Sequence, residues 1–146
     1  MDGREFFIGL GKCFKVWFFS FMMKFREVVL ASGRKVFGGK SAENNDELVR
    51  VAGRNDLMLH TQAPGSPFVN VGEKPSKKDL KEAAVFCARY SQDWRDNKRN
   101  VVVNVFFRRD MKKGIFSKVG SWKVGKAESV VVKKSWILEF EKNEAG

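Results

Sequence analysis

The strongest constraint on the fold is a helix signal between residues 75 and 94. Ser76 and Asp79 have the spacing of a capping box, in which each side chain bonds the other residue's backbone N–H at a helix start. An apolar stripe at helical period follows, formed by Leu80, Ala83, Ala84, Cys87, Ala88 and Trp94. We interpret this stripe as the face of a helix that packs on a core, and not as a cofactor site.

Short β-rich segments separated by turn residues surround this helix. Residues 101–107 are nearly all apolar and β-branched, which is typical of a strand buried on both faces. A second helix is expected at residues 42–52, with Ser41 as its cap. The other expected strands are residues 25–30 and 35–37, forming a hairpin, and residues 56–61, 68–71, 129–133 and 136–141. The pattern predicts a single α+β domain with a mixed β-sheet and about two main helices.

The first 22 residues do not fit this pattern. Residues 6–23 are aromatic and apolar, but Lys12 and Lys15 interrupt them, which argues against a membrane-spanning helix. The charged start and the lack of a small-residue cleavage site argue against a signal peptide. Two hypotheses remain for residues 1–22: an upstream extension of the reading frame, or a segment that lies on a membrane surface. We expect residues 23–146 to form the domain, and we expect no membrane partner.

The net charge is the strongest indication of a partner. The chain carries +11 at pH 7, and such a charge favours polyanions through steering and counterion release. Nine of the excess charges lie in residues 95–134, where twelve Lys and Arg residues stand against three acidic ones. Phe116 and Trp122 are interleaved with them, so this segment predicts an RNA surface with phosphates on the cations and bases on the rings. The alternative is a solvated basic loop whose aromatic rings belong to the core.

Few residues suggest catalysis or a metal. His60 could act as a general base with Asp56 or Glu43 nearby, although a single histidine on a strand is more often structural. Cys13, Cys87 and one histidine are too few for a structural zinc site. We therefore expect no metal and no cofactor. Cys87 is interpreted as a small buried hydrophobe, which suits a reducing compartment.

A diglycine precedes the expected helix at Ser41. Backbone N–H groups before a helix N-terminus attract anions, so Gly38, Gly39 and Lys40 are candidates for contacting a phosphate. Asn45 and Asp46, in the first turns of that helix, could contact a ribose or a base edge. The alternative is that the two glycines only allow the hairpin to leave the sheet.

Four motifs in order resemble one known family. The segments GGKSAENNDELV, DLMLH, PGSPFV and PSKKDLKEAAVFCARYS are similar to successive motifs of the NFACT-R domain, the RNA-binding part of the NFACT proteins of ribosome-associated quality control. The resemblance covers about residues 24–140. Two positions depart from the family pattern: Met58 replaces an aromatic residue, and Pro67 replaces a histidine.

The resemblance implies an RNA-binding domain that contacts tRNA or ribosomal RNA in the cytoplasm. It further implies the large ribosomal subunit or a partner protein as a binding partner, no DNA partner, and a stand-alone form, because the companion NFACT domains cannot fit in this length. The alternative function is an RNA-processing or RNA-modifying enzyme that uses His60 and Asp56. The residues expected to contact RNA are Gly38, Gly39, Lys40, Asn45, Asp46, Arg54, His60, Ser66, Arg108, Arg109, Lys112, Lys113 and Lys118.

Overall fold

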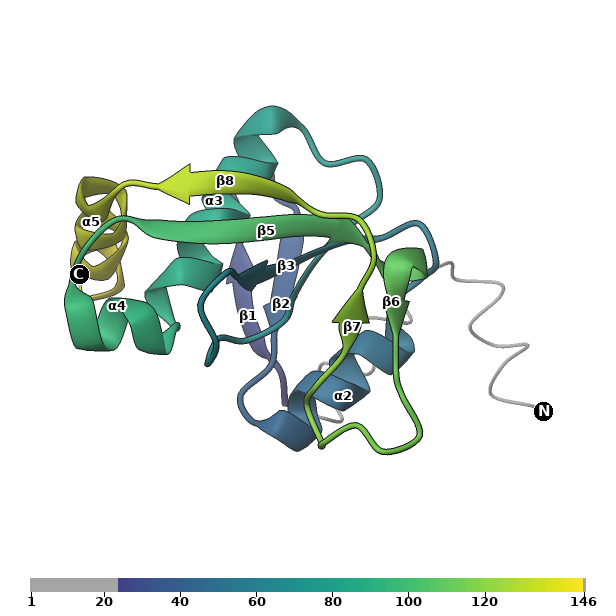
Figure 1. The fold of residues 1–146 in the computed structure, drawn as a ribbon. Helices are drawn as coiled ribbons and strands as arrows, with labels where there is room; N and C mark the ends of the chain where they lie inside the picture. The colour runs from purple at the N-terminus through teal and green to yellow at the C-terminus, as the bar shows by residue number, and fades with distance from the viewer. Residues whose placement is uncertain (1–23, 146) are drawn as a thin grey trace.

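The structure is a computed structural model that describes residues 24–145, so the extension predicted at residues 1–22 lies outside the described residues. Pairs of strands are separated by helices along the first part of this chain, and a run of short strands precedes the last helix (Figure 1). In order they are β1 (Arg26–Val29), β2 (Lys35–Gly38), α2 (Ala42–Val51), β3 (Leu57–Thr61), β4 (Val69–Gly72), α3 (Lys77–Arg89), α4 (Gln92–Asn97), β5 (Val101–Phe107), the short 3-10 helix η1 (Arg108–Asp110), β6 (Met111–Lys112), β7 (Lys123–Val124), β8 (Glu128–Val132) and α5 (Lys134–Ala145).

The central layer is one sheet, which within residues 24–145 has the strand order β1-β2-β4-β3-β5-β8. The predicted α+β single domain is confirmed, and the two expected helices are α2 and α3. A mixed sheet was expected, but every pairing among the described strands is antiparallel. Strand direction depends on how each connection crosses the sheet, which residue patterns do not record. β6 and β7 form a separate two-stranded sheet, and they lie in the chain between β5 and β8 of the main sheet.

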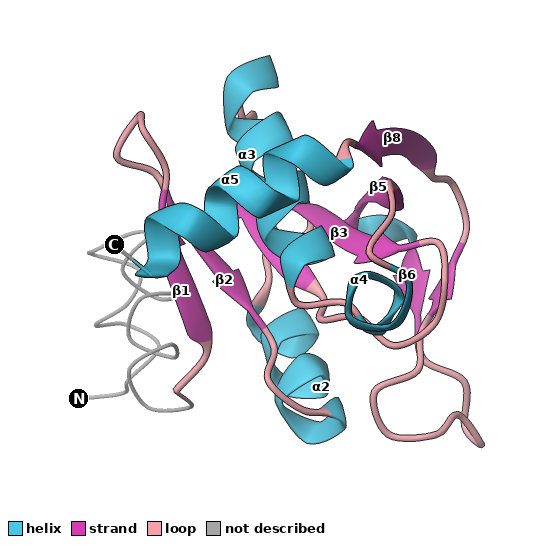
Figure 2. Ribbon diagram, turned by 90° about the vertical axis from the view of Figure 1, so that its left-hand side faces the viewer, coloured by secondary structure: helices cyan, strands magenta, loops and turns pink. Residues whose placement is uncertain are grey.

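Successive side chains along each strand point to opposite faces of the sheet, and the two faces differ. Leu59 pairs with Val105 and belongs to a core cluster with α3, whereas Met58 pairs with Phe106 and belongs to a second cluster with α2. Figure 2 shows α3 and α5 together over one face and α2 on the other. β5 was expected to be buried on both faces, but its residues alternate between buried and half-buried up to Val105. The second face is therefore only partly covered.

The helix predicted from the capping box is confirmed, with one interruption. Ser76 Oγ accepts from the Asp79 N–H, and Asp79 accepts in return from the Ser76 N–H. The stripe continues past a break at Tyr90, because Ser91 caps α4 and Trp94 enters the same core. Cys87 is fully buried, and that burial raises the pKa of its thiol to about 12, as suits a small core residue.

The strand predicted at residues 136–141 is wrong, because this segment lies inside helix α5. Trp136, Leu138 and Phe140 alternate in the sequence, which suggested a strand. In the structure Ile137 is fully buried, Trp136 and Phe140 pack beside it, and Leu138 is 48% exposed. Apolar positions at spacings of one, three and four residues fit one helical face equally well. The packing of this face on α3 decides in favour of a helix.

The carboxylate of Asp46 holds the loop between β6 and β7 against α2. Its Oδ1 accepts hydrogen bonds from Lys113 Nζ at 3.0 Å, the Gly120 N–H at 3.0 Å and Trp122 Nε1 at 2.9 Å. Lys113 Nζ also donates to the carbonyls of Lys118 and Ser121. Asp46 and Lys113 were expected to contact RNA, but these groups are committed to internal contacts. Asp46 cannot reach an RNA because only 6% of its side chain is exposed, and its three donors occupy the carboxylate from within the protein.

The surroundings of Asp46 favour its charged form. Burial works against the charge, but hydrogen bonds from Lys113, Gly120 and Trp122 and the nearby ammonium outweigh it and lower the pKa of the carboxyl. A lowered pKa in the folded state means that Asp46 stabilises the protein at neutral pH. That contribution is lost as the pH falls below the ordinary carboxyl range.

Replacing Asp46 should therefore destabilise the whole domain. Asp46→Ala removes the acceptor of three donors and leaves the Lys113 ammonium without its counter-charge. We expect the free energy of unfolding, measured by urea denaturation, to fall by about 2 to 4 kcal/mol. The control is Lys112→Met at the exposed neighbouring position, which should change it by less than about 0.5 kcal/mol. Equally small losses in both variants would contradict an anchoring role for Asp46.

Candidate nucleic-acid interface

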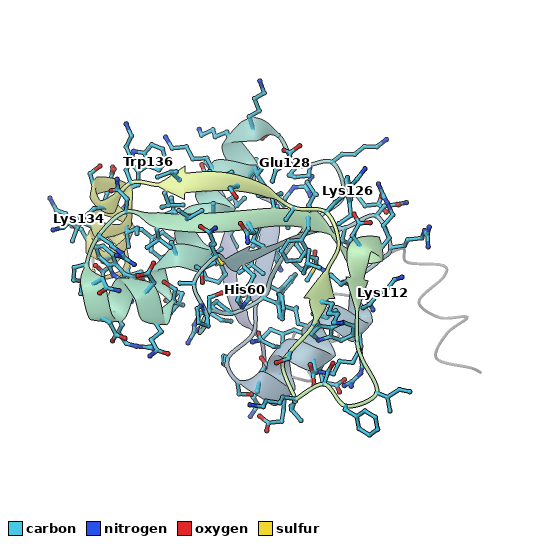
Figure 3. All side chains as sticks on the ribbon, in the orientation of Figure 1. His60, Lys112, Lys126, Glu128, Lys134 and Trp136 are labelled. Carbon is cyan, nitrogen blue, oxygen red and sulfur yellow. The ribbon has the colours of Figure 1, made fainter. Side chains whose placement is uncertain are left out.

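An open cleft of about 730 Å³ lies on the partly covered face of the sheet. It brings together segments that are distant in the sequence: the diglycine loop, His60 on β3, the turn at residues 64–67, α4, and the loop at residues 119–122. Figure 3 shows His60 near the middle of the view, between α4 and α2. The cationic side chains that line the cleft are Arg26, Lys40 and Arg95. Among the residues that the structure describes, no Asp or Glu lines it.

The diglycine loop forms one wall, but not as a cradle of free amides. The Gly39 N–H donates to the carbonyl of Phe68, and the Lys40 N–H donates to Asn44 Oδ1. A Cβ on Gly38 would come within 3.0 Å of the Phe86 ring, and one on Gly39 would overlap the side chain of Asn45. The glycines are thus needed for close packing, and neither has a positive φ. Only the Lys40 side chain, which is exposed, remains free to meet a phosphate.

Asn45 and Ser66 line the cleft and fix the backbone around it. Asn45 Oδ1 accepts from the Phe68 N–H at 3.0 Å. Ser66 Oγ accepts from the Thr61 N–H and donates to the carbonyl of Pro67, both at 3.0 Å. These bonds join α2 and the turn at residues 64–67 to the central strands. Both side chains hold the walls of the cleft in place.

The two departures from the family motifs have structural explanations. Met58 is fully buried in the cluster beneath α2, so it fills core volume as an aromatic residue would. Pro67 lines the cleft, and its carbonyl accepts from Ser66 Oγ and from Cys87 Sγ. The cleft therefore carries a single imidazole, that of His60, among its described residues.

His60 is fixed on the floor of the cleft. Its Nδ1 lies 2.7 Å from the carbonyl oxygen of Thr61, and its ring lies 4.7 Å from that of Phe68 between centroids. Burial lowers the pKa of the imidazole, against a smaller opposing effect of the bond to Thr61. The ring is therefore neutral at physiological pH. Its cross-strand partner on β5 is Asn104, which also lines the cleft.

Asp56 is separated from His60 by the length of β3. Its carboxylate accepts from the Gly53 N–H at 2.7 Å and from Asn70 Nδ2 at 3.2 Å, and its side chain is buried. Four residues along a strand span about 13 Å. The structure therefore does not bring together the pair that the enzyme hypothesis used.

The other basic residues expected to contact RNA lie outside the cleft. Arg108 Nε donates to the Val49 carbonyl at 2.7 Å, and its guanidinium lies over the Trp122 ring. Arg109 donates to Asn55 and stacks on Phe107. Arg54, Lys112 and Lys118 are exposed. Figure 3 places Lys112 on the β6 side of the molecule, apart from His60.

Between β6 and β7 the loop exposes two apolar side chains at its tip. Ile115 is 95% exposed and Phe116 is 98% exposed. A turn closed by the Ser117 N–H to the Gly114 carbonyl, and by the Gly114 N–H to Ser117 Oγ, shapes this tip. Of the two aromatic residues predicted to stack on bases, Phe116 is free to do so. Trp122 is half-buried and bonded to Asp46.

Two cations of the cleft were not placed there by the sequence. Arg26 is in a strand far from the basic segment, whereas Arg95 begins that segment but reaches the cleft on α4, apart from the loop between β6 and β7. Asn104 does stand out, because it is the one polar residue in the apolar run of β5. No helix within residues 24–145 is both long and apolar enough to cross a membrane.

Comparisons with known proteins bear on the family of this chain and on its fold. The family model of the NFACT protein RNA-binding domain matches residues 16–125. Among solved structures, the fold is similar to the C-terminal part of the fibronectin/fibrinogen-binding protein from Streptococcus suis, with a TM-score of 0.70 and 20% identity. That likeness covers 79% of this chain and 48% of that one, so this chain spans about half of that structure. A comparison with curated proteins found no match. The family model covers most of the chain, which therefore belongs to the family of NFACT RNA-binding domains.

Proposed function

We propose that this domain binds structured RNA of the tRNA or ribosomal RNA class through the cleft on its partly covered sheet face. The observation that carries the proposal is the composition of the cleft. Its lining combines Arg26, Lys40 and Arg95 with aromatic rings and hydrogen-bonding side chains, and among the described residues it contains no carboxylate. Phosphates bind cations, and unstacked bases bind aromatic rings and polar side chains.

The exposed loop between β6 and β7 extends this surface. Residues 111–127 contain five lysines and no acidic residue. The Lys113 charge is matched by Asp46, which leaves the other four to attract a polyanion. Phe116 stands among them as an exposed ring, and base stacking on such a ring is tolerant of sequence.

We further propose that the domain binds RNA without chemically altering it. The support is the distance between His60 and Asp56 and the internal bonds of Asp56, which leave the imidazole without an acidic partner in the cleft. A role in the cytoplasm, at the ribosome or in its quality control, with the large subunit or a partner protein, rests on family membership.

The affinity for a structured RNA such as a tRNA should fall steeply with salt. About five phosphate contacts would give a slope of roughly −3 to −5 for log Ka against log salt concentration. Lys40→Met should make the slope shallower by about 0.7 to 0.9, because one phosphate contact is lost. Fluorescence anisotropy from low to moderate salt measures both quantities. Lys142→Met, on the exposed surface of α5 and outside the cleft, is the matched control for charge. A slope near zero, or the same slope change in both variants, would overturn the proposal.

Removal of the exposed ring at the loop tip should weaken binding without affecting folding. Because Phe116 is 98% exposed, Phe116→Ser should leave the melting temperature unchanged. Loss of a stacked base should cost about 1 to 3 kcal/mol of binding free energy. Phe116→Trp should bind at least as well as the parent, whereas Ile115→Ser, which removes a comparably exposed apolar side chain, should have a smaller effect. Equal affinity for parent and Phe116→Ser would exclude stacking at this position.

A further inference from the structure

The hydrogen bond to Thr61 fixes which proton the His60 ring carries. A carbonyl oxygen has no proton to give, so at 2.7 Å the ring nitrogen Nδ1 must be the donor. Burial lowers the pKa of His60, which keeps the ring neutral. A neutral imidazole with its proton on Nδ1 has a lone pair on Nε2. His60 therefore has a hydrogen-bond acceptor at the end of the ring opposite to Thr61.

This acceptor is open to a ligand. His60 is half-buried and is one of the residues that line the open cleft. The ring lines the cleft and is packed against Phe68, which limits its rotation. An acceptor held in one orientation can select a donor.

A donor lies beside this acceptor on the same face of the sheet. Asn104 is directly opposite His60 in the β3–β5 pairing, and side chains in that relation are about 5 Å apart at their Cβ atoms. Asn104 Oδ1 accepts from Ser129 Oγ at 3.0 Å, which leaves Nδ2 to donate. The cleft thus presents one acceptor and one donor next to each other, and its lining also contains the exposed cations Lys40 and Arg95.

We propose that His60 accepts a hydrogen bond from the hydroxyl or amino group of one unpaired nucleotide, with Asn104 donating to the same nucleotide. The proposal rests on the RNA-binding function and specifies what enters the cleft. In a duplex the amino groups of the bases are engaged in pairing and the ring faces are stacked, although the ribose hydroxyls stay exposed in the minor groove. An unpaired nucleotide presents its hydroxyl, its amino group and its ring face together. The cations that line the cleft would then hold its flanking phosphates.

The test uses the full chain and an RNA hairpin with a single-stranded loop, beside a fully paired duplex of the same length. His60→Phe keeps a ring against Phe68 but has no acceptor, and we expect it to weaken hairpin binding about fivefold to tenfold. The salt dependence should stay unchanged, because no phosphate contact is lost. Duplex binding should not change. His60→Gln, which retains an acceptor oxygen, should restore most of the affinity. Thermal unfolding checks that each variant folds.

Two further arms identify the donor and separate the possible failures. A 2′-deoxy substitution in the loop of the RNA removes a ribose hydroxyl, and inosine in place of guanosine removes an amino group. The donor is identified by the substitution that makes the parent and His60→Phe bind the hairpin with equal affinity. If His60→Phe fails to fold, Asn104→Ala takes its place and should weaken hairpin binding to a similar extent. Should the parent bind RNA with a steep salt slope while the folded variant binds the hairpin equally well, this inference fails and the RNA-binding function stands. Should the parent bind neither RNA, the function itself fails.

Discussion

The unequal covering of the two sheet faces is the constraint on which the rest of this structure depends. On one face α3 and α5 bury a continuous apolar layer that includes Leu59, Val69 and Val103. On the other face α2 and the β6–β7 pair cover one end only, so the apolar positions Met58 and Phe106 give way to the polar pair of His60 and Asn104. A sheet with one face sealed can leave part of the other open to a ligand. The cleft is this uncovered portion, and its walls come from motifs that the sequence keeps well apart.

The excess positive charge of the chain has two separate uses. Some cations make internal contacts that hold the fold together. Lys113 neutralises the buried carboxylate of Asp46, and Arg108 donates to the backbone carbonyl of Val49. Others, such as Lys40 and Arg95, are exposed at the cleft. A count of charges cannot separate these uses, because the distinction depends on burial and on which acceptor lies within reach. The loop between β6 and β7 combines an anchored part and an exposed part. The Gly120 N–H of this loop donates to Asp46 on α2, whereas Phe116 at the loop tip is exposed.

Elements whose residue pattern has a local physical cause could be predicted from the sequence. Contacts between distant segments could not. The capping box at Ser76 and the stripe that follows it depend on neighbouring residues, so α3 could be predicted. The alternation at residues 136–141 suggested a strand because the face that packs on α3 cannot be seen in the sequence. His60 and Ser66 were identified from motifs and do line the cleft. Arg26 was not, because only the fold brings β1 to that place. Asp46 was expected to contact RNA from its position after the diglycine, and its internal role was missed because its three donors come from residues 113–122.

The central claim is that RNA enters the cleft on the partly covered face and extends to the loop beside it. The most direct measurement is a titration of ¹⁵N-labelled protein with a tRNA-derived hairpin, followed by amide chemical shifts. We expect the largest shifts to cluster at residues 39–42, 60–68, 92–95 and 114–122, while α5 on the opposite side of the sheet stays unchanged. Shifts concentrated on α5, with the amides around His60 unmoved, would contradict it.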